Sequence, residues 1–324
     1  MRRRAFIAML GGAAAWPYAV RAQQRSNVPL LGVLSPISAA AAARNMAALR
    51  AGLHDLGYVE GQNVTIAFRF ADGVIERLPA LAAELVALKP AVIVAGSPPA
   101  AVAVHDLTRA IPIVMNSSPD PIALGLAASL ARPGGNVTGF WWGDEGLVGK
   151  QIQLLREVVP SLSRVGIAVH PDDATTPTAD LPGIAGALGL AARVIEVHSA
   201  ADFETVFATA AREQLQGLHF GTSPLFIGNR ATVTALAARV RLPVVYGIRE
   251  FVTAGGLMSY GTNLPEVYRR KAVLVDKILK GAKPADLPIQ RPTAFELVIN
   301  VKAAQELGLT VSESLLLRAD EVIE

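Results

Sequence analysis

Residues Val92-Ile93-Val94-Ala95-Gly96 are followed directly by Ser97-Pro98, and this arrangement decides the fold. An apolar run ends in a small polar residue, and a proline follows at once. Short uninterrupted apolar runs are typical of strands buried on both faces of a parallel sheet. Serine is a favoured helix N-cap, and proline is favoured at the first helical position. The stretch therefore predicts a strand-to-helix turn at the carboxyl end of a strand, the edge where open α/β sheets bind ligands.

The same arrangement occurs at four other places in the chain. Apolar runs end directly before Ser35-Pro36, Ser118-Pro119, His170-Pro171 and Ser223-Pro224. Further strand-like runs lie at 64–70, 137–140, 192–197, 243–247, 257–260 and 295–300, and helical spacing separates most of them, as near 122–131. Strands that alternate with helices predict an α/β fold with parallel sheets and right-handed crossovers.

The second half of the chain repeats the pattern of the first. Gly96-Ser97-Pro98 with a later Pro112-Ile113-Val114 corresponds to Thr222-Ser223-Pro224 with a later Pro243-Val244-Val245. This echo predicts two Rossmann-like lobes joined by a hinge, with a cleft between their facing strand ends. Trp141 and Trp142 lie near the expected crossover between the lobes, where they either pack the hinge or form a stacking surface.

Composition excludes several classes of site. The chain has 324 residues, 52% of them hydrophobic and 18% charged, which is enough for two folded domains. It has no cysteine, so disulfides, thiol nucleophiles and zinc-thiolate sites are excluded. The five histidines form no metal-binding pair, and no nucleophile elbow, Walker sequence or dinucleotide fingerprint occurs. We therefore expect no enzyme, with no catalytic residue, no metal and no cofactor.

The N-terminus has the layout of an export signal. Residues 1–22 combine Arg2-Arg3-Arg4, an apolar stretch to Val20 and a small-residue cleavage site before Gln23. The Arg-Arg-x-Phe-Ile pattern resembles a twin-arginine signal, and the alternative is a membrane anchor. The chain beyond this segment has 26 basic and 27 acidic residues, a net charge of −1, which argues against a nucleic-acid partner. We expect a cleavable signal and a periplasmic location.

The first-lobe turns are candidates for holding a charged ligand. Helix N-termini with free N–H groups suit a carboxylate, and we expect Ser97, Ser118 and nearby N–H groups to hold one. The alternative is that each serine only caps a helix. Asp120 is a candidate partner for a ligand ammonium, with first-turn placement or an Asx-turn as the alternative.

The second lobe offers a wall of mixed character at residues 246–251. Tyr246-Gly247-Ile248-Arg249-Glu250-Phe251 either stacks on a ligand and pairs with its polar ends, or forms an exposed loop with a surface Arg–Glu pair. Neutral hydrogen bonds are expected from Ser35, Thr222 and Ser223. The complete set of expected ligand-binding residues is Ser35, Ser97, Pro98, Asn116, Ser118, Asp120, His170, Thr222, Ser223, Tyr246, Arg249 and Glu250.

Several longer motifs carry a family resemblance. They are Gly57-Tyr58-Val59-Glu60-Gly61-Gln62-Asn63 and the segments 78–86, 129–139, 246–252, 255–261, 275–281 and 295–300. Together they resemble the ABC-transporter substrate-binding family that includes tryptophan-binding lipoproteins of Gram-positive bacteria. The resemblance implies a type I periplasmic-binding fold with three crossovers. By that analogy, 28–140 with 256–282 form the N-terminal lobe, and 141–255 with 283–324 form the C-terminal lobe.

The resemblance implies capture of a small solute and its delivery to an ABC permease in the inner membrane. The candidate residues indicate an amino acid or a related carboxylate, with aromatic amino acids among the candidates. The chain lacks the lipobox cysteine of the Gram-positive members, so we expect a monomer that diffuses in the periplasm. Two alternatives stay open, namely a sensing module that presents its closed form to a membrane receptor and a periplasmic enzyme on the same fold.

Overall fold

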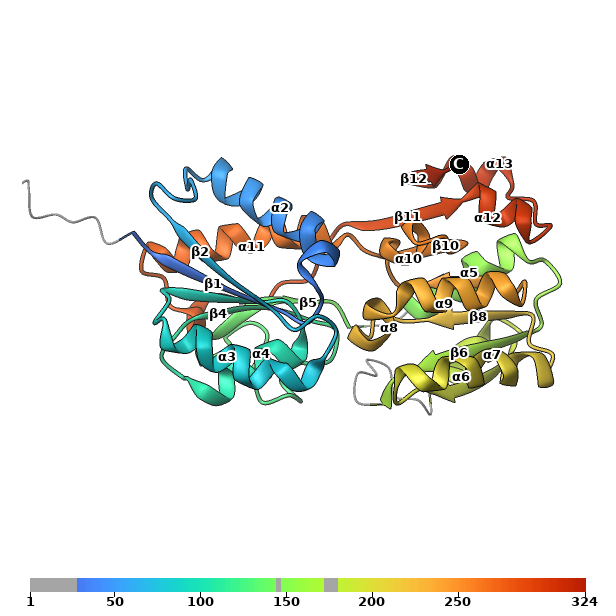
Figure 1. The fold of residues 1–324 in the computed structure, drawn as a ribbon, viewed down its shortest axis with the longest axis horizontal. Coiled ribbons are helices and arrows are strands. Elements are labelled where there is room, and N and C mark those ends of the chain that lie inside the picture. Colours follow the sequence, from blue (N-terminus) through green and yellow to red (C-terminus); the bar gives the residue numbers. More distant parts are fainter. Residues whose placement is uncertain (1–27, 144–146, 172–179) are drawn as a thin grey trace, which may run out of the picture.

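The chain folds into two α/β lobes that lie side by side along the long axis of the molecule (Figure 1). This computed structural model describes residues 28–143, 147–171 and 180–324. The predicted export signal at 1–22 lies outside the described residues. Within them, no helix combines the length and the apolar character that crossing a membrane requires.

The first lobe is built on a parallel sheet of five strands in the order β2-β1-β3-β4-β5. Helices α2 and α11 cover one face, and α3 and α4 cover the other (Figure 1). The strands are β1 (Leu30–Ser35), β2 (Thr65–Phe70), β3 (Val92–Ala95), β4 (Ile113–Ser117) and β5 (Val137–Trp141), and the helices are α2 (Ala39–Asp55), α3 (Leu78–Ala87), α4 (Pro98–Leu107) and α11 (Leu264–Leu279).

The second lobe contains a sheet of seven strands in the order β12-β11-β10-β9-β8-β6-β7. All its pairs are parallel except β10 with β11. The strands are β6 (Arg164–Val169), β7 (Ala191–Glu196), β8 (Gly217–Phe220), β9 (Val244–Tyr246), β10 (Met258–Thr262), β11 (Phe295–Asn300) and β12 (Glu321–Ile323). The helices are α5 (Leu147–Val158), α6 (Leu181–Ala187), α7 (Phe203–Arg212), α8 (Pro224–Gly228), α9 (Arg230–Arg239), α10 (Arg249–Thr253), α12 (Val301–Glu306) and α13 (Glu313–Leu316).

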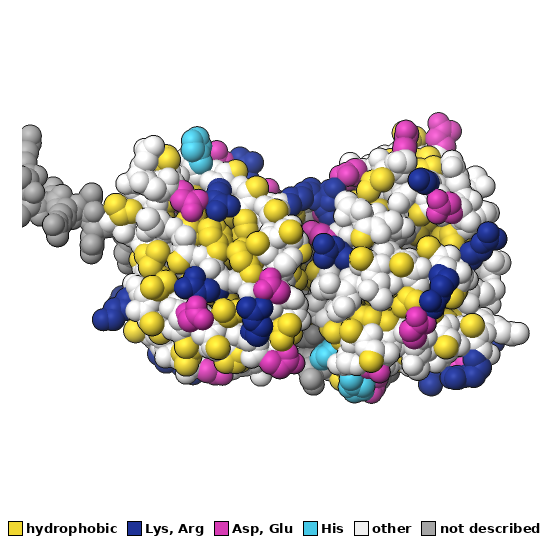
Figure 2. All heavy atoms as spheres, viewed as in Figure 1, with side chains coloured by type: hydrophobic (Ala, Val, Ile, Leu, Met, Phe, Trp, Pro, Cys, Tyr) yellow, Lys and Arg dark blue, Asp and Glu magenta, His cyan; other side chains and the backbone are white. Residues whose placement is uncertain are grey.

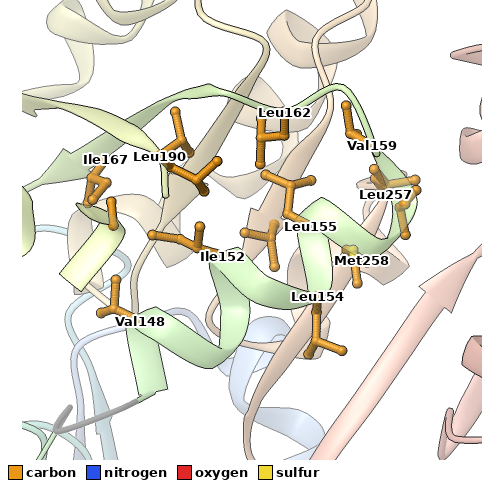
Figure 3. Packing of buried hydrophobic residues seen from close by; sticks show 14 of the residues in the cluster. Val148, Ile152, Leu154, Leu155, Val159, Leu162, Ile167, Leu190, Leu257 and Met258 are labelled. Carbon is orange, nitrogen blue, oxygen red and sulfur yellow. The ribbon is translucent and has the colours of Figure 1, made fainter. Parts of the chain in front are cut away.

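Each sheet is buried on both faces, as the continuous apolar runs predict. In the second lobe, Ile152 and Leu155 of α5 pack onto Ile167 of β6 and Met258 of β10 (Figure 3). These four side chains are at most 1% exposed. Full burial of one such side chain contributes about 1.5–3 kcal/mol. The α/β prediction with parallel sheets is confirmed, and the packed faces leave the strand ends as the place for a site.

The chain crosses between the lobes at three places. The crossovers follow β5, follow β10 at Asn263, and precede β11. The predicted boundaries are wrong for 256–262, since β10 pairs with β9 in the second sheet. They are also wrong for 283–291, since Thr138 Oγ1 donates to Leu287 O at 2.8 Å in the first lobe. The pairing partners are remote in sequence, so the local pattern does not reveal them. We propose the domain division 28–141 with 264–291, and 147–262 with 295–324.

Two of the five predicted strand-to-helix turns form as expected. Ser97 caps α4 and Ser223 caps α8, each through a backbone N–H donated to its Oγ. Ser35 does not cap α2, because Ser38 accepts from Ala41 N instead. The residues that follow His170-Pro171 lie outside the described part of the chain.

The predicted helix at 122–131 is wrong, because this segment forms a series of turns. Asp120 Oδ1 accepts from Ile122 N at 2.8 Å, and Gly125 lies at a φ of 69°. A left-handed residue after a single turn redirects the chain. Ser118-Pro119 therefore leads into an irregular loop at the cleft and not into a helix.

Candidate functional site

A cleft of about 920 Å³, including space open to solvent, lies between the facing strand ends of the two lobes. Figure 2 shows the indentation between the lobes on one face of the molecule. The first lobe contributes Ser35, Pro36, Ile37, Ala42, Asn45, Gly96, Ser97, Pro98, Asn116, Ser118, Leu264 and Tyr268. The second lobe and the crossovers contribute Trp142, Leu147, Thr222, Pro224, Ile227, Gly247, Ile248, Glu250 and Thr262.

Seven of the twelve predicted site residues lie on this cleft. They are Ser35, Ser97, Pro98, Asn116, Ser118, Thr222 and Glu250. The other five, Asp120, His170, Ser223, Tyr246 and Arg249, are not among its lining residues. The roles proposed for the seven stay predictions, but their positions bring the first-lobe serines and one second-lobe carboxylate together.

The helix start after Ser97 offers the serine hydroxyl but no free N–H from its first four residues. Its Oγ accepts from Ala100 N at 3.2 Å, which leaves the O–H to donate outward. Pro98 and Pro99 have no N–H, and Ala101 N donates to Ser97 O at 3.0 Å. The expected free N–H groups are therefore missing at the start of α4, because two are replaced by proline and two are used within the turn.

Asn116 is held at the cleft floor by a buried lysine. Its Nδ2 donates to Gly96 O at 3.2 Å, and its Oδ1 accepts from Lys271 Nζ. Lys271 also donates to Ala95 O at 3.0 Å and lies 4.2 Å from the centre of the Tyr268 ring. Burial holds the pKa of Lys271 well below its usual value. Sequence reasoning missed this lysine, although its spacing from Val267 and Val275 places it on the buried stripe of α11.

Gly96 permits the close packing of Tyr268 behind the floor. A Cβ at Gly96 would lie 2.8 Å from Tyr268 Oη and 3.1 Å from Leu34 O. The backbone oxygen of Leu34 in β1 cannot move away easily, so a side chain at Gly96 would have to displace the Tyr268 hydroxyl and press on β1. The strand end and the helix are thus in direct contact at the cleft.

The two tryptophans at the crossover have different surroundings. Trp141 donates from Nε1 to Ser118 O at 3.0 Å, and Arg291 lies 4.4 Å from the centre of its ring. Trp142 lines the cleft and is 9% exposed. Trp141 therefore packs the crossover, while Trp142 is the one that lies on the cleft wall.

Asp120 has the structural role that its Asx-turn alternative describes. Its carboxylate is exposed and accepts from Ile122 N within its own loop. The acidic side chain on the cleft wall is Glu250 of α10. Of the described residues that line the cleft, Glu250 is the only acidic one, and none is Lys or Arg.

The prediction that Tyr246 stacks on a ligand in the cleft is wrong. Tyr246 is 0% exposed and stacks on Phe251, with ring centres 4.5 Å apart and planes 7° apart. Burial raises the pKa of its hydroxyl, which has no hydrogen-bond partner among the described residues. The ring belongs to the second-lobe core with Phe220, because β9 directs it away from the cleft and under α10.

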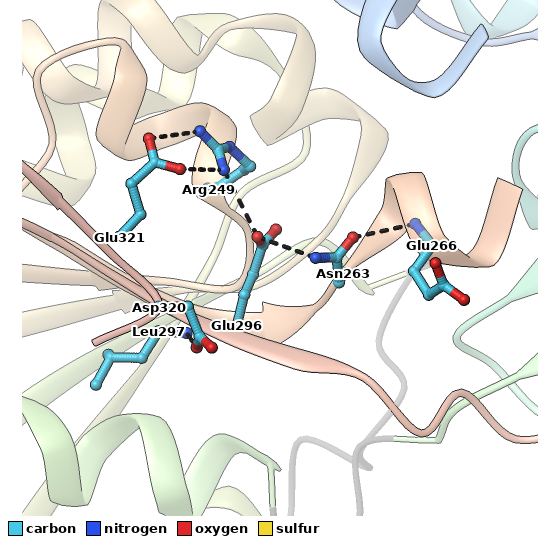
Figure 4. Close-up of polar contacts among 7 residues, drawn as sticks. All are labelled: Arg249, Asn263, Glu266, Glu296, Leu297, Asp320 and Glu321. Carbon is cyan, nitrogen blue, oxygen red and sulfur yellow. Dashed lines mark hydrogen bonds and ion pairs between the residues drawn. The ribbon is translucent and has the colours of Figure 1, made fainter. Parts of the chain in front are cut away.

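Arg249 is engaged at the hinge and not in the cleft (Figure 4). It binds both oxygens of Glu321 at 2.7 and 2.8 Å and lies 3.6 Å from Glu296 Oε2. Glu296 accepts from Asn263 Nδ2 at 3.3 Å, and Asn263 caps α11 through Glu266 N. Burial raises the pKa of Glu296, and the Arg249 hydrogen bond lowers the pKa of Glu321. This network joins α10, β11, β12 and the crossover at Asn263.

His170 and Ser223 stand at strand ends beside the cleft without lining it. Ser223 is 7% exposed and caps α8 through Leu225 N. His170 is half-buried after β6. Among the described residues, no group of His, Cys, Asp and Glu is arranged to hold a metal ion.

Two buried polar atoms on the cleft have unmet hydrogen-bonding capacity. Asn45 Oδ1 of α2 and Thr262 Oγ1 of β10 have no partner among the described residues. Both residues line the cleft and are only 5% and 4% exposed. Buried polar groups without partners are costly, so these atoms are suited to a ligand or water. Sequence reasoning missed both, because each lies within an otherwise regular helix or strand.

Comparisons with known proteins identify related binding proteins. A tyrosine-binding protein of Clostridioides difficile (strain R20291) is 25% identical over 275 residues, which are 83% of this chain and 79% of that protein. A solved Streptococcus pneumoniae ABC domain in complex with L-Trp superposes with a TM-score of 0.82 at 27% identity and covers 91% of this chain and 99% of that one.

A sugar-binding protein of a Bacillus halodurans ABC transporter shares the fold alone, with a TM-score of 0.61 at 14% identity over 86% of this chain and 100% of that one. Such neighbours identify the type I periplasmic-binding fold. Residues 31–323 match the family described as ABC transporter substrate binding protein. The chain belongs to this family of solute-binding proteins.

Proposed function

We propose that this protein binds an amino acid between its lobes and delivers it to the permease of an ABC importer. The observation that carries the proposal is the position of Glu250, an acidic side chain on the second-lobe wall of a cleft whose first-lobe wall carries hydroxyl and amide groups. A zwitterionic amino acid has an ammonium for the second-lobe wall and a carboxylate for the first-lobe wall. The Glu250 carboxylate can accept a strong, charge-assisted hydrogen bond from an ammonium.

The carboxylate end is assigned to the first lobe. Ser97, Asn116 and Ser118 supply neutral donors at adjacent strand ends, since β3 and β4 are neighbours in the sheet. Hydrogen bonds to a charged group are stronger than those between neutral groups, which allows neutral donors to hold a carboxylate. Asp120, which lies in its own turn, is not part of this proposal.

The ligand side chain is assigned to the apolar part of the cleft. Trp142, Tyr268, Ile37, Ile227 and Leu264 line it and offer flat and branched surfaces. The names of the C. difficile and S. pneumoniae relatives favour aromatic amino acids. We therefore propose tyrosine and tryptophan as the first ligands to test.

The remaining parts of the proposal concern the cellular setting. Family membership and the signal-like N-terminus support an exported, periplasmic protein that acts as a monomeric carrier and performs no catalysis. Three crossovers support closure of the lobes by hinge bending, the motion by which binding proteins enclose a ligand. The permease would recognise the closed form.

Thermal unfolding with a panel of the twenty amino acids tests the proposal. A ligand at a hundred times its Kd stabilises the folded state by about 2.7 kcal/mol, so a true ligand raises the melting midpoint clearly. We expect stabilisation by L-tyrosine or L-tryptophan and none by the corresponding decarboxylated amines. If no amino acid at millimolar concentration raises the midpoint, the proposed ligand class is wrong. Uptake of the ligand by cells with and without the protein tests delivery.

A further inference from the structure

Lys271 is a fully buried lysine that no carboxylate neutralises. It is 0% exposed on α11, and among the residues that the structure describes it forms no ion pair. Its partners are Ala95 O, Asn116 Oδ1 and the face of the Tyr268 ring. Burial of an amine without a counter-ion is costly, and the same burial lowers the pKa of Lys271. A leucine or methionine here would avoid this cost.

Every partner of Lys271 belongs to the cleft or adjoins it. Asn116 and Tyr268 line the cleft, and Ala95 directly precedes Gly96, which also lines it. Asn116 Nδ2 donates in turn to Gly96 O at 3.2 Å. Lys271 therefore stands behind the floor where the ends of β3 and β4 meet, and it ties both strand ends to α11.

The chemistry of the amine fixes which way the Asn116 amide points. Lys271 has two N–H groups when neutral and three when charged, so in either state it can donate to both of its oxygen partners, while Gly96 O on the other side of Asn116 can only accept. The oxygen of Asn116 must therefore face Lys271, and the nitrogen must face away. Nδ2 has two N–H groups, of which one binds Gly96 O. The other is left for the cleft, where it can donate to a ligand but cannot accept.

We propose that Lys271 is a positioning residue that makes the first-lobe floor selective for a ligand carboxylate. It holds Asn116 with the N–H toward the cleft, so that the floor presents an amide donor and no amide acceptor to the ligand. This inference rests on the proposed function, because it assigns the carboxylate of the amino acid to the floor at Asn116.

The first experiment measures ligand selectivity by calorimetry. Lys271→Met fills the same space without a donor, and Lys277→Met removes an exposed lysine of the same helix as the matched control. The probes are L-tyrosine and L-tryptophan, each compared with its carboxamide. We expect Lys271→Met to weaken the acids by about tenfold to hundredfold and the amides much less, since a charged hydrogen bond is lost. Lys277→Met should bind as wild type does.

A second variant covers the case in which Lys271→Met does not fold. Asn116→Asp keeps an oxygen for Lys271 but replaces the N–H on the cleft side with an oxygen. It should weaken the acids at least as strongly with Lys271 intact. A purely structural role for Lys271 predicts equal weakening of acid and amide. If the folded Lys271→Met, or Asn116→Asp, keeps the wild-type ratio of acid to amide affinity, the proposal is overturned.

A ligand-free measurement separates this inference from the proposed function. The side-chain amide protons of Asn116 can be followed by NMR and assigned through their loss in Asn116→Asp. We expect these signals to shift and to exchange faster with solvent in Lys271→Met but not in Lys277→Met. Unchanged Asn116 signals in Lys271→Met would refute the positioning role. If wild-type protein binds no amino acid, the proposed function fails, while this measurement still decides the role of Lys271.

Discussion

The two walls of the cleft use polar residues in opposite ways. In the first lobe the strand ends present Ser35, Ser97, Asn116 and Ser118 to the cleft. In the second lobe, polar side chains of β8 and β9 turn inward, so that Tyr246 lies in the core and His219 is buried against Gln151. The second-lobe surface is left with mostly small and apolar residues, the two threonines Thr222 and Thr262, and the single carboxylate of Glu250.

The difference indicates that the two lobes, although similar in fold, have different roles in ligand binding. A wall of fixed neutral donors suits the group that all amino acids share. A mostly apolar wall with one charge suits closure, the fixing of ligand orientation and the selection of ligand side chains. Two lobes of similar fold thus present different surfaces to the cleft, because successive side chains of a strand point to opposite faces of its sheet.

The largest expected effect is a loss of stability at acidic pH that the second lobe causes. Burial lowers the pKa of His219 from 6.5 to about 4, and its Nε2 lies 2.6 Å from Gln151 Oε1. Between these pH values the unfolded chain binds a proton that the folded chain does not. Stability therefore falls as the pH falls through this window, by about 3 kcal/mol in total.

Denaturant unfolding from pH 7 to pH 4 measures this loss. His219→Gln removes the titrating group and should flatten the decline, whereas substitution of the exposed His54 by Gln should not. An equally steep decline in His219→Gln would show that the buried polar pair of the second lobe does not control acid stability.

The next largest effect is a loss of amino-acid affinity, which distinguishes the two acidic residues predicted for the site, Glu250 and Asp120. Glu250→Gln removes the carboxylate on the cleft, and we expect amino-acid affinity to fall by about tenfold to hundredfold. Asp120→Asn is the matched control, because its side chain lies outside the cleft and only loses part of a turn contact. Calorimetry that finds the larger loss in Asp120→Asn would reverse the assignment.

A smaller effect is expected at the buried hydroxyl of Thr262. Thr262→Val removes a group with no partner in the described part of the chain, so stability without ligand should not fall. If the hydroxyl meets the ligand, affinity should drop by about threefold to tenfold. Thr253→Val, at an exposed position in α10, serves as the control. Unchanged affinity in Thr262→Val would exclude this residue from the site.

The smallest effect is expected at Tyr246. Tyr246→Phe removes a buried hydroxyl without a described partner and keeps the stack on Phe251. We expect the free energy of unfolding to rise by about 1 kcal/mol, with ligand affinity unchanged. Weaker binding in this variant would mean that the second lobe does present its tyrosine to the ligand.

The features that could be predicted from the sequence are those set by residues close together in the chain. The apolar runs before Ser97 and Ser223 identified strands and helix caps correctly, since both signals are local. The signal failed at Ser118, where Asp120 and Gly125 stabilise turns in place of a helix. A proline after a strand marks a turn reliably, but the residues beyond the proline decide whether a helix or a loop comes next.

The site was predicted in part, because side-chain direction depends on remote contacts. Tyr246 and Glu250 are close in sequence, but the packing of α10 on β9 buries one and exposes the other to the cleft. Lys271 is more than 150 residues from Asn116, and no local pattern connects them. The domain boundaries failed for the same reason, since the pairing of β10 with β9 decides where the chain crosses.

A crystal structure of the complex with L-tyrosine or L-tryptophan tests the central claim most directly. We predict the amino acid between the lobes, with its carboxylate in hydrogen-bond contact with Ser97 Oγ and Asn116 Nδ2 and its ammonium on the Glu250 carboxylate. A ligand bound in the reverse orientation would contradict the account. So would a ligand in a second pocket of the C-terminal lobe, which Ala237 of α9 and Ala303 of α12 help to line.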